Sequence, residues 1–71
     1  MIRYDKHARD RMEERGVTEQ DVELALRRRR RVTPGPLGRI WIWGYSGGRE
    51  LKVGVSTYDQ QYVITVAWPD E

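Results

Sequence analysis

The chain has no cysteine, no phenylalanine, a single histidine and no long run of hydrophobic residues. Without cysteine no disulfide can form, and a tetrahedral zinc site built on thiolates is excluded. No segment approaches the roughly 20 apolar residues that span a bilayer, and no apolar run near the first residue resembles a signal peptide. We therefore expect a cytoplasmic protein that does not associate with membranes.

The length of 71 residues suits one small domain over residues 1–71, with a thin hydrophobic core. The formal net charge is only +2, but the charges are unevenly distributed. Residues 1–31 hold ten Lys and Arg against seven Asp and Glu, whereas residues 32–71 hold three against four. A basic half of this kind favours an anionic partner, and nucleic acid before any other.

Capping residues predict two short helices in the first half of the chain. The first covers residues 6–15, because Asp5 can cap its start and Gly16 can end it in the left-handed conformation. A capping-box pattern at residues 18–21 starts the second helix, which continues into the arginine run at residues 27–31. The helix dipole favours this order, in which acidic residues lie near the start of the helix and arginines near its end.

The second half of the chain is predicted to form strands. Residues 33–38 hold two prolines and two glycines, which cannot continue a helix and separate the two halves. Alternating β-branched, aromatic and aliphatic residues predict strands at 39–45, 50–56 and 62–68. Residues 2–4 are a candidate for a short extra edge strand. Connections this short favour an antiparallel meander.

The predicted fold is α+β, with two N-terminal helices packed on one face of a three-stranded or four-stranded antiparallel sheet. Alternation gives the helix-facing surface the aliphatic residues Ile40, Ile42, Leu51, Val53, Val55, Ile64 and Val66. It gives the opposite face Trp41, Trp43, Tyr45, Lys52, Gly54, Val63 and Thr65. Two tryptophans on a face that no helix covers require an explanation.

The string His-Ala-x-x-Arg-Met-x-x-Arg-Gly-Val at residues 7–17, followed by a capped helix and a sheet that ends in Val-Ile-Thr-Val, resembles the family called domain of unknown function 4258. The resemblance covers the chain from His7 to Trp68. It implies a RelE-like fold related to the RelE/ParE-like toxins, an RNA-directed, toxin-like activity, and an antitoxin protein as a partner.

The family pattern marks five residues, of which Met12 and Gly16 are structural; the full set is His7, Arg11, Met12, Arg15 and Gly16. Toxins of the wider superfamily also rely on basic residues and often on a tyrosine. The candidates by residue type are Tyr58, Tyr62, Lys52, Arg39 and Arg49.

A catalytic hypothesis rests on the first helix. Metal-independent RNA cleavage needs groups that exchange protons and cations that stabilise charge on the phosphate. His7, Arg11 and Arg15 share one stripe of the helix, since residues four apart lie on the same side, and they form the candidate catalytic group without a metal or other cofactor. The alternative is structural: His7 bonds a backbone carbonyl or stacks on Tyr4, and the arginines pair with Glu14 or the second helix.

A nucleic-acid-binding hypothesis rests on the arginine run and the aromatic sheet face. Arginines can bind phosphates, and bases can stack on indoles. The candidate residues are Arg27, Arg28, Arg30, Arg31, Trp41, Trp43 and Lys52. Alternatively the arginines are a solvated helix end, and the tryptophans form an interface with another protein or a second copy. Two functions stay open: an RNA-binding or metal-independent ribonuclease domain, or a non-catalytic interaction or dimerisation module.

Overall fold

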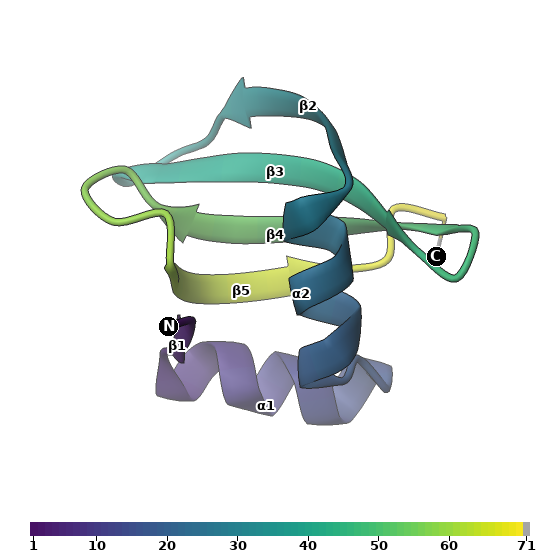
Figure 1. The fold of residues 1–71 in the computed structure, drawn as a ribbon. Coiled ribbons are helices and arrows are strands. Elements are labelled where there is room, and N and C mark those ends of the chain that lie inside the picture. Colours follow the sequence, from purple (N-terminus) through teal and green to yellow (C-terminus); the bar gives the residue numbers. More distant parts are fainter. Residues whose placement is uncertain (71) are drawn as a thin grey trace.

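The computed structural model describes residues 1–70 and shows two helices and a five-stranded mixed sheet (Figure 1). In chain order the elements are β1 (Arg3–Tyr4), α1 (Lys6–Arg15), α2 (Glu19–Arg27), β2 (Arg29–Pro34), β3 (Arg39–Ser46), β4 (Arg49–Ser56) and β5 (Tyr62–Ala67). The strand order is β1-β5-β4-β3-β2, in which β1 is parallel to β5 and the other neighbours are antiparallel. The predicted α+β class is confirmed. The predicted sheet is corrected, because it has five strands and one parallel pair.

Both helices begin at the residues that the capping patterns predict. Asp5 accepts a hydrogen bond from a backbone amide in the first turn of α1 at 3.0 Å, and Gly16 ends that helix with a φ of 65°. Thr18 and Asp21 form a reciprocal capping box at α2. Burial alone would raise the pKa of Asp21, but hydrogen bonds from Ser46 and Thr18 outweigh burial and hold the pKa below its usual value. The bond from Ser46 also attaches the start of α2 to the end of β3.

The two helices pack against different parts of the sheet. α2 crosses β3 and β4, and α1 lies along β5 (Figure 1). The fully buried aliphatic side chains of the sheet are Ile42, Leu51, Val53, Val55, Val63 and Val66. α2 approaches β3 so closely that a Cβ atom at Gly44 would lie 2.0 Å from the carbonyl oxygen of Ala25. The absence of a side chain at Gly44 therefore sets the distance between the two layers.

An irregularity in β5 changes which of its residues face the helices. The register shifts so that Val63 pairs with Val55, which leaves Ile64 as the extra residue of a β-bulge. Val63 is fully buried and Ile64 is half-buried. Val63 therefore faces the core with Val55, which corrects its predicted place on the opposite face.

Strand β2 corrects a second expectation from the sequence. The arginine run does not stay at the helix end: only Arg27 belongs to α2, and Arg29–Pro34 pairs with β3 at the edge of the sheet. The register of this pair shifts between Arg29 and Arg31, which marks a bulge at Arg30. The chain therefore passes from the helices into the sheet at Arg28, and residues 35–38 connect β2 to β3 instead of separating the two halves.

We expect Gly44→Ala to lower the free energy of unfolding by about 2 kcal/mol or more. The new methyl group would meet backbone atoms of α2, which cannot rotate away as a side chain could. Urea denaturation followed by far-ultraviolet circular dichroism measures the change. An unchanged midpoint and slope would mean that α2 can move away from β3 without cost.

Candidate nucleic-acid interface

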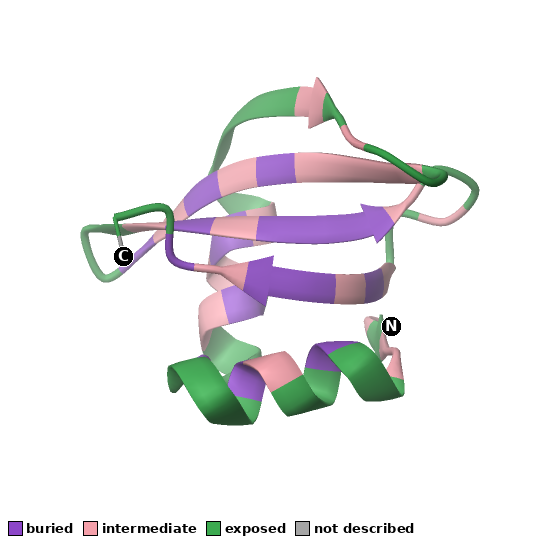
Figure 2. Ribbon diagram, turned by 180° about the vertical axis from the view of Figure 1, so that it is seen from behind, coloured by how far each residue is buried: buried purple, intermediate pink, exposed green. Residues whose placement is uncertain are grey.

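One face of the sheet lies opposite α2, and within residues 1–70 no helix crosses in front of β2, β3 or β4 on that side (Figure 2). The side chains on it follow from the alternation along each strand and from the register between strands. We name this surface the open face; it consists of Arg30, Arg31, Thr33, Arg39, Trp41, Trp43, Tyr45, Glu50, Lys52, Gly54 and Thr65.

The two tryptophans of β3 lie on the open face, as the alternation predicts. The indole of Trp41 lies against Gly54, where a Cβ atom would be only 3.0 Å from Cζ3 of the ring. The Nε1 atom of Trp43 donates a hydrogen bond to Oγ1 of Thr33 at 3.0 Å. Both indoles are half-buried, so each keeps part of its ring accessible.

Cationic side chains lie over both indoles. Nζ of Lys52 is 4.1 Å from the ring centre of Trp41 and 5.0 Å from that of Trp43. The guanidinium carbon of Arg31 is 4.2 Å from the Trp43 ring, and that of Arg39 is 6.0 Å from the Trp41 ring. The register places Arg31, Trp43 and Lys52 in one row across β2, β3 and β4. This row alternates cation, indole and cation.

The bulge in β2 adds a further arginine to the open face. The guanidinium of Arg30 lies over the Tyr45 ring at 5.4 Å, donates to the Tyr45 hydroxyl at 2.8 Å and is 3.9 Å from the Glu50 carboxylate. Arg29 points to the helix-covered side, where Nε donates to the carbonyl oxygen of Leu26 at 3.0 Å. The side chains of Arg29 and Arg30 therefore lie on opposite faces of the sheet.

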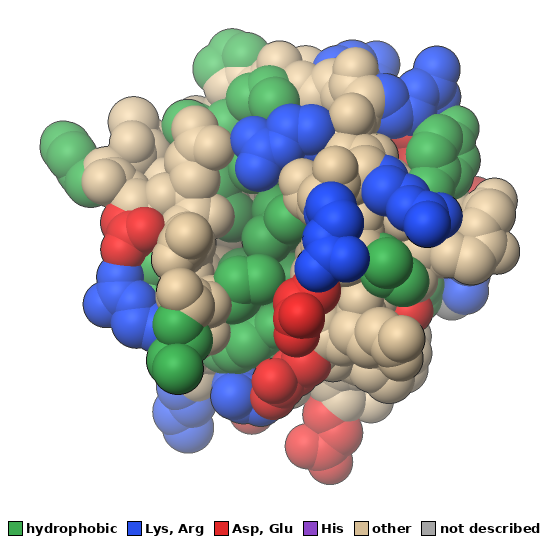
Figure 3. All heavy atoms as spheres, viewed as in Figure 1, with side chains coloured by type: hydrophobic (Ala, Val, Ile, Leu, Met, Phe, Trp, Pro, Cys, Tyr) green, Lys and Arg blue, Asp and Glu red, His purple; other side chains and the backbone are tan. Residues whose placement is uncertain are grey.

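The open face is strongly basic. Among the described residues it holds four cations, Arg30, Arg31, Arg39 and Lys52, and the single carboxylate of Glu50. The remaining candidates, Arg27 and Arg28, are exposed at the C-terminal end of α2. Figure 3 shows the side of the sheet that α2 covers. Lys and Arg side chains gather near the C-terminal end of α2, and acidic side chains lie toward its N-terminal end. A positive potential therefore follows β2 on both of its faces.

The predicted catalytic group of α1, His7, Arg11 and Arg15, does not present three free side chains, because the guanidinium of Arg15 bonds to the backbone of β5. Nη1 of Arg15 donates to the carbonyl oxygen of Val66 at 2.5 Å. The carbonyl oxygen of Arg15 accepts a hydrogen bond from Nε1 of Trp68 at 2.8 Å. Arg15 therefore joins the last turn of α1 to the end of β5.

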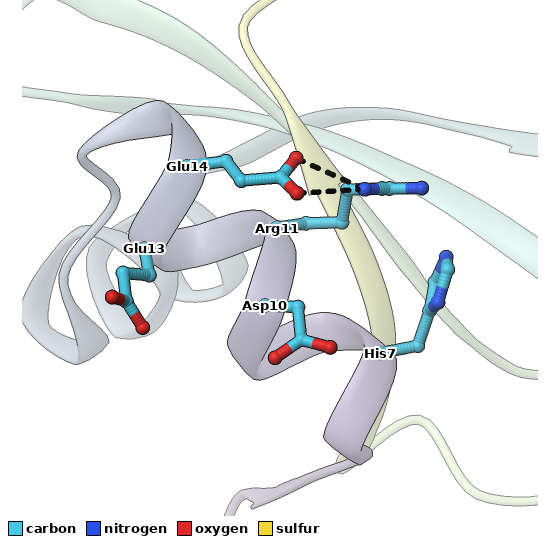
Figure 4. A pocket seen from close by; sticks show the side chains of 5 residues that line it. All are labelled: His7, Asp10, Arg11, Glu13 and Glu14. Carbon is cyan, nitrogen blue, oxygen red and sulfur yellow. Dashed lines mark hydrogen bonds and ion pairs between the residues drawn. The ribbon is translucent and has the colours of Figure 1, made fainter.

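The other two members of the stripe, His7 and Arg11, border an open hollow of about 470 Å³ on α1 (Figure 4). Their side chains project from the same side of the helix, but the Arg11 guanidinium is already paired with Glu14 at 2.9 Å. The hollow is also lined by Asp10 and Glu13. Three carboxylates against one guanidinium make this surface unfavourable for a phosphate.

The tyrosines and Arg49, which are candidates by residue type, lie apart from the open face. The Tyr62 hydroxyl donates to Asp5 at 2.7 Å, which lowers the pKa of Asp5 and raises the pKa of Tyr62. Tyr62 thereby supports the cap of α1. Tyr58 is 95% exposed in the loop after β4, and the guanidinium carbon of Arg49 lies 4.0 Å from the Trp68 ring centre.

Sequence comparison supplies a family but no activity. The profile of the family described as domain of unknown function (DUF4258) matches residues 4–68. No curated protein and no solved structure matches the chain. Within residues 1–70, no helix is both long and apolar enough to cross a membrane.

The structural role of Arg15 can be tested by Arg15→Gln. We expect the free energy of unfolding to fall by about 1 kcal/mol, because the charge-assisted bond to the Val66 carbonyl is lost. Lys6→Gln is the control on the same helix, since it removes one exposed positive charge from α1. Equal stability of the Arg15 variant and the wild type would contradict a structural role for this guanidinium.

Proposed function

The chain belongs to the DUF4258 family, and from the surface of this member we propose that it binds single-stranded RNA along the open face. The observation that carries the proposal is the row of Arg31, Trp43 and Lys52, with the Trp41 indole beside it. Stacking platforms and phosphate-binding groups alternate in this row. That combination is typical of surfaces that bind single-stranded nucleic acid.

Bases can replace the cations that lie over the indoles. An exposed cation–π contact contributes about 0.5–1 kcal/mol, whereas a base stacked on an aromatic side chain contributes ~1–3 kcal/mol. Lys52 and Arg31 have long flexible stems, so that each can exchange an indole for a phosphate oxygen and form a charge-assisted hydrogen bond. Stacking on Trp41 and Trp43, with both cations moved to phosphates, is therefore favourable.

The spacing of the rings favours a single strand. Trp41, Trp43 and Tyr45 recur at every second residue of β3, which places them about 7 Å apart along the strand. Successive bases of an extended strand can each meet a ring. A duplex keeps the faces of its bases stacked inside the helix, where these side chains cannot reach them.

A second copy of this chain fits the open face less well than RNA does. A two-fold interface presents the same surface from both partners, so that Lys52, Arg31 and Arg39 would face like charges. Like charges in contact cost several kcal/mol, and lysine is depleted from protein interfaces. An acidic protein partner, such as an antitoxin, would meet the same cations, and failure of the wild type to bind RNA in the experiment below would favour that partner instead.

A relationship to RelE/ParE-like toxins belongs to this proposal. It is supported by two helices followed by an antiparallel run of strands. The basic open face suits the RNA target that such a relationship implies. Cleavage of the bound RNA would be an additional property and is tested separately.

We expect Trp41→Leu and Trp43→Leu each to weaken binding of a fluorescein-labelled uridylate decamer by roughly 5- to 150-fold, the equivalent of ~1–3 kcal/mol per stacked base. Fluorescence anisotropy at low salt measures the affinity. Tyr58→Leu is the matched control, because it removes an aromatic ring that is 95% exposed in the loop after β4. This control should bind like the wild type.

Three outcomes would overturn the proposal. The wild type does not bind the decamer, the Tyr58 control loses as much affinity as the tryptophan variants, or a duplex of the same length binds as tightly as the single strand. Sedimentation of the same proteins identifies the competing use of the face. A concentration-dependent dimer that Trp43→Leu disrupts would assign the face to a second copy.

Metal-independent cleavage is a second candidate function, which one observation favours: His7 and Arg11 project from the same side of α1 (Figure 4). This hypothesis predicts that the protein cleaves RNA in the presence of EDTA. It also predicts that His7→Ala abolishes cleavage and leaves RNA binding unchanged, since the general acid–base group alone is lost. RNA that stays intact with the wild type would remove the ribonuclease hypothesis and leave the binding proposal in place.

A further inference from the structure

We infer that a single strand bound on the open face continues over the edge of β2 and reaches Arg27 and Arg28 on the helix-covered side. This inference rests on the proposed function. It assigns the arginine run the role of guiding one strand around the edge of the sheet. The bound RNA is then longer than the open face alone can hold.

The arginine run places cations on both sides of one edge within a short distance. Arg30 and Arg31 contact rings of the open face, whereas Arg27 and Arg28 are exposed where α2 ends. Consecutive Cα atoms are about 3.8 Å apart, so the Cα atoms of Arg28 and Arg30 are separated by at most about 7.6 Å. A single strand that crosses this edge can therefore meet cations of both groups.

Arg29, which lies between the two groups, prepares this path without binding the ligand. Its guanidinium donates to the carbonyl oxygen of Leu26 and to Oε1 of Gln60 at 3.2 Å. The first bond satisfies a free carbonyl at the C-terminal end of α2, whose negative partial charge would otherwise repel a phosphate. Within residues 1–70, no hydrogen bond or ion pair engages the side chains of Arg27 and Arg28.

The edge itself is accessible. β2 is the last strand of the sheet, with β3 on one side and no described strand on the other (Figure 1). Val32, in the middle of β2, is 49% exposed. A flexible single strand can bend across such an edge, whereas a duplex, with a persistence length of roughly 150 base pairs, cannot.

The test compares a uridylate tetramer, which the open face alone can hold, with a dodecamer, which can also cross the edge. Affinities are measured over a range of salt concentrations. For the dodecamer, Arg27→Gln/Arg28→Gln should reduce the slope of log affinity against log salt by about 1.4, since each phosphate contact on a single strand contributes about 0.7. Its affinity at 0.1 M salt should fall on the order of tenfold. The tetramer should bind this variant like the wild type.

The matched control is Lys6→Gln/Arg9→Gln, which removes the same charge from α1 and should leave both affinities unchanged. If Arg27→Gln/Arg28→Gln weakened tetramer and dodecamer binding equally, or if this control lost as much affinity, the arginines would act only through net charge. Either result would overturn the inference. A dodecamer unaffected by Arg27→Gln/Arg28→Gln would also overturn it. Failure of the wild type to bind either oligonucleotide would instead overturn the proposed function on which the inference rests.

Discussion

Two short helices cannot cover both faces of a five-stranded sheet, and the rest of the structure depends on this constraint. α2 lies directly on the β3 backbone at Gly44, and α1 is occupied along β5. The opposite face would be a large apolar patch if its strands were purely aliphatic. Instead the charged ends of Arg31 and Lys52 lie over its indoles, which makes the face polar as well as aromatic. The face is therefore compatible with water, and its indoles can still stack with other rings.

Features that depend on a few neighbouring residues could be predicted from the sequence. Asp5 and Gly16 delimit α1, and the capping box at residues 18–21 starts α2, because each of these signals acts within one turn of helix. The placement of Trp41 and Trp43 on one face follows equally from the two-residue period of a strand. These signals are sufficient for the fold class and for the aromatic part of the candidate site.

Features that depend on distant pairing could not be predicted. Arginine favours helices and suits a helix end, so the run at residues 27–31 is locally compatible with a continued helix. Only its pairing with β3 makes it a strand, and only the bulge at Arg30 directs neighbouring arginines to opposite faces. The bond from Arg15 to a carbonyl 51 positions away likewise has no local signal. Helical spacing alone therefore predicted three available side chains on α1, although the guanidinium of Arg15 is engaged.

The positive charge of β2 affects both self-association and the proposed binding of RNA. An edge strand beside half-buried indoles can pair with another sheet, and proteins oppose such pairing with charged edge residues and bulges. Here both devices occur in the same strand. Two copies joined edge to edge would bring the three arginines of each β2 into one small area, which opposes such pairing. A polyanion meets no such penalty, because it neutralises the charges that repel a second copy. Under the proposed function, the arginines that oppose self-association are therefore also those that bind RNA.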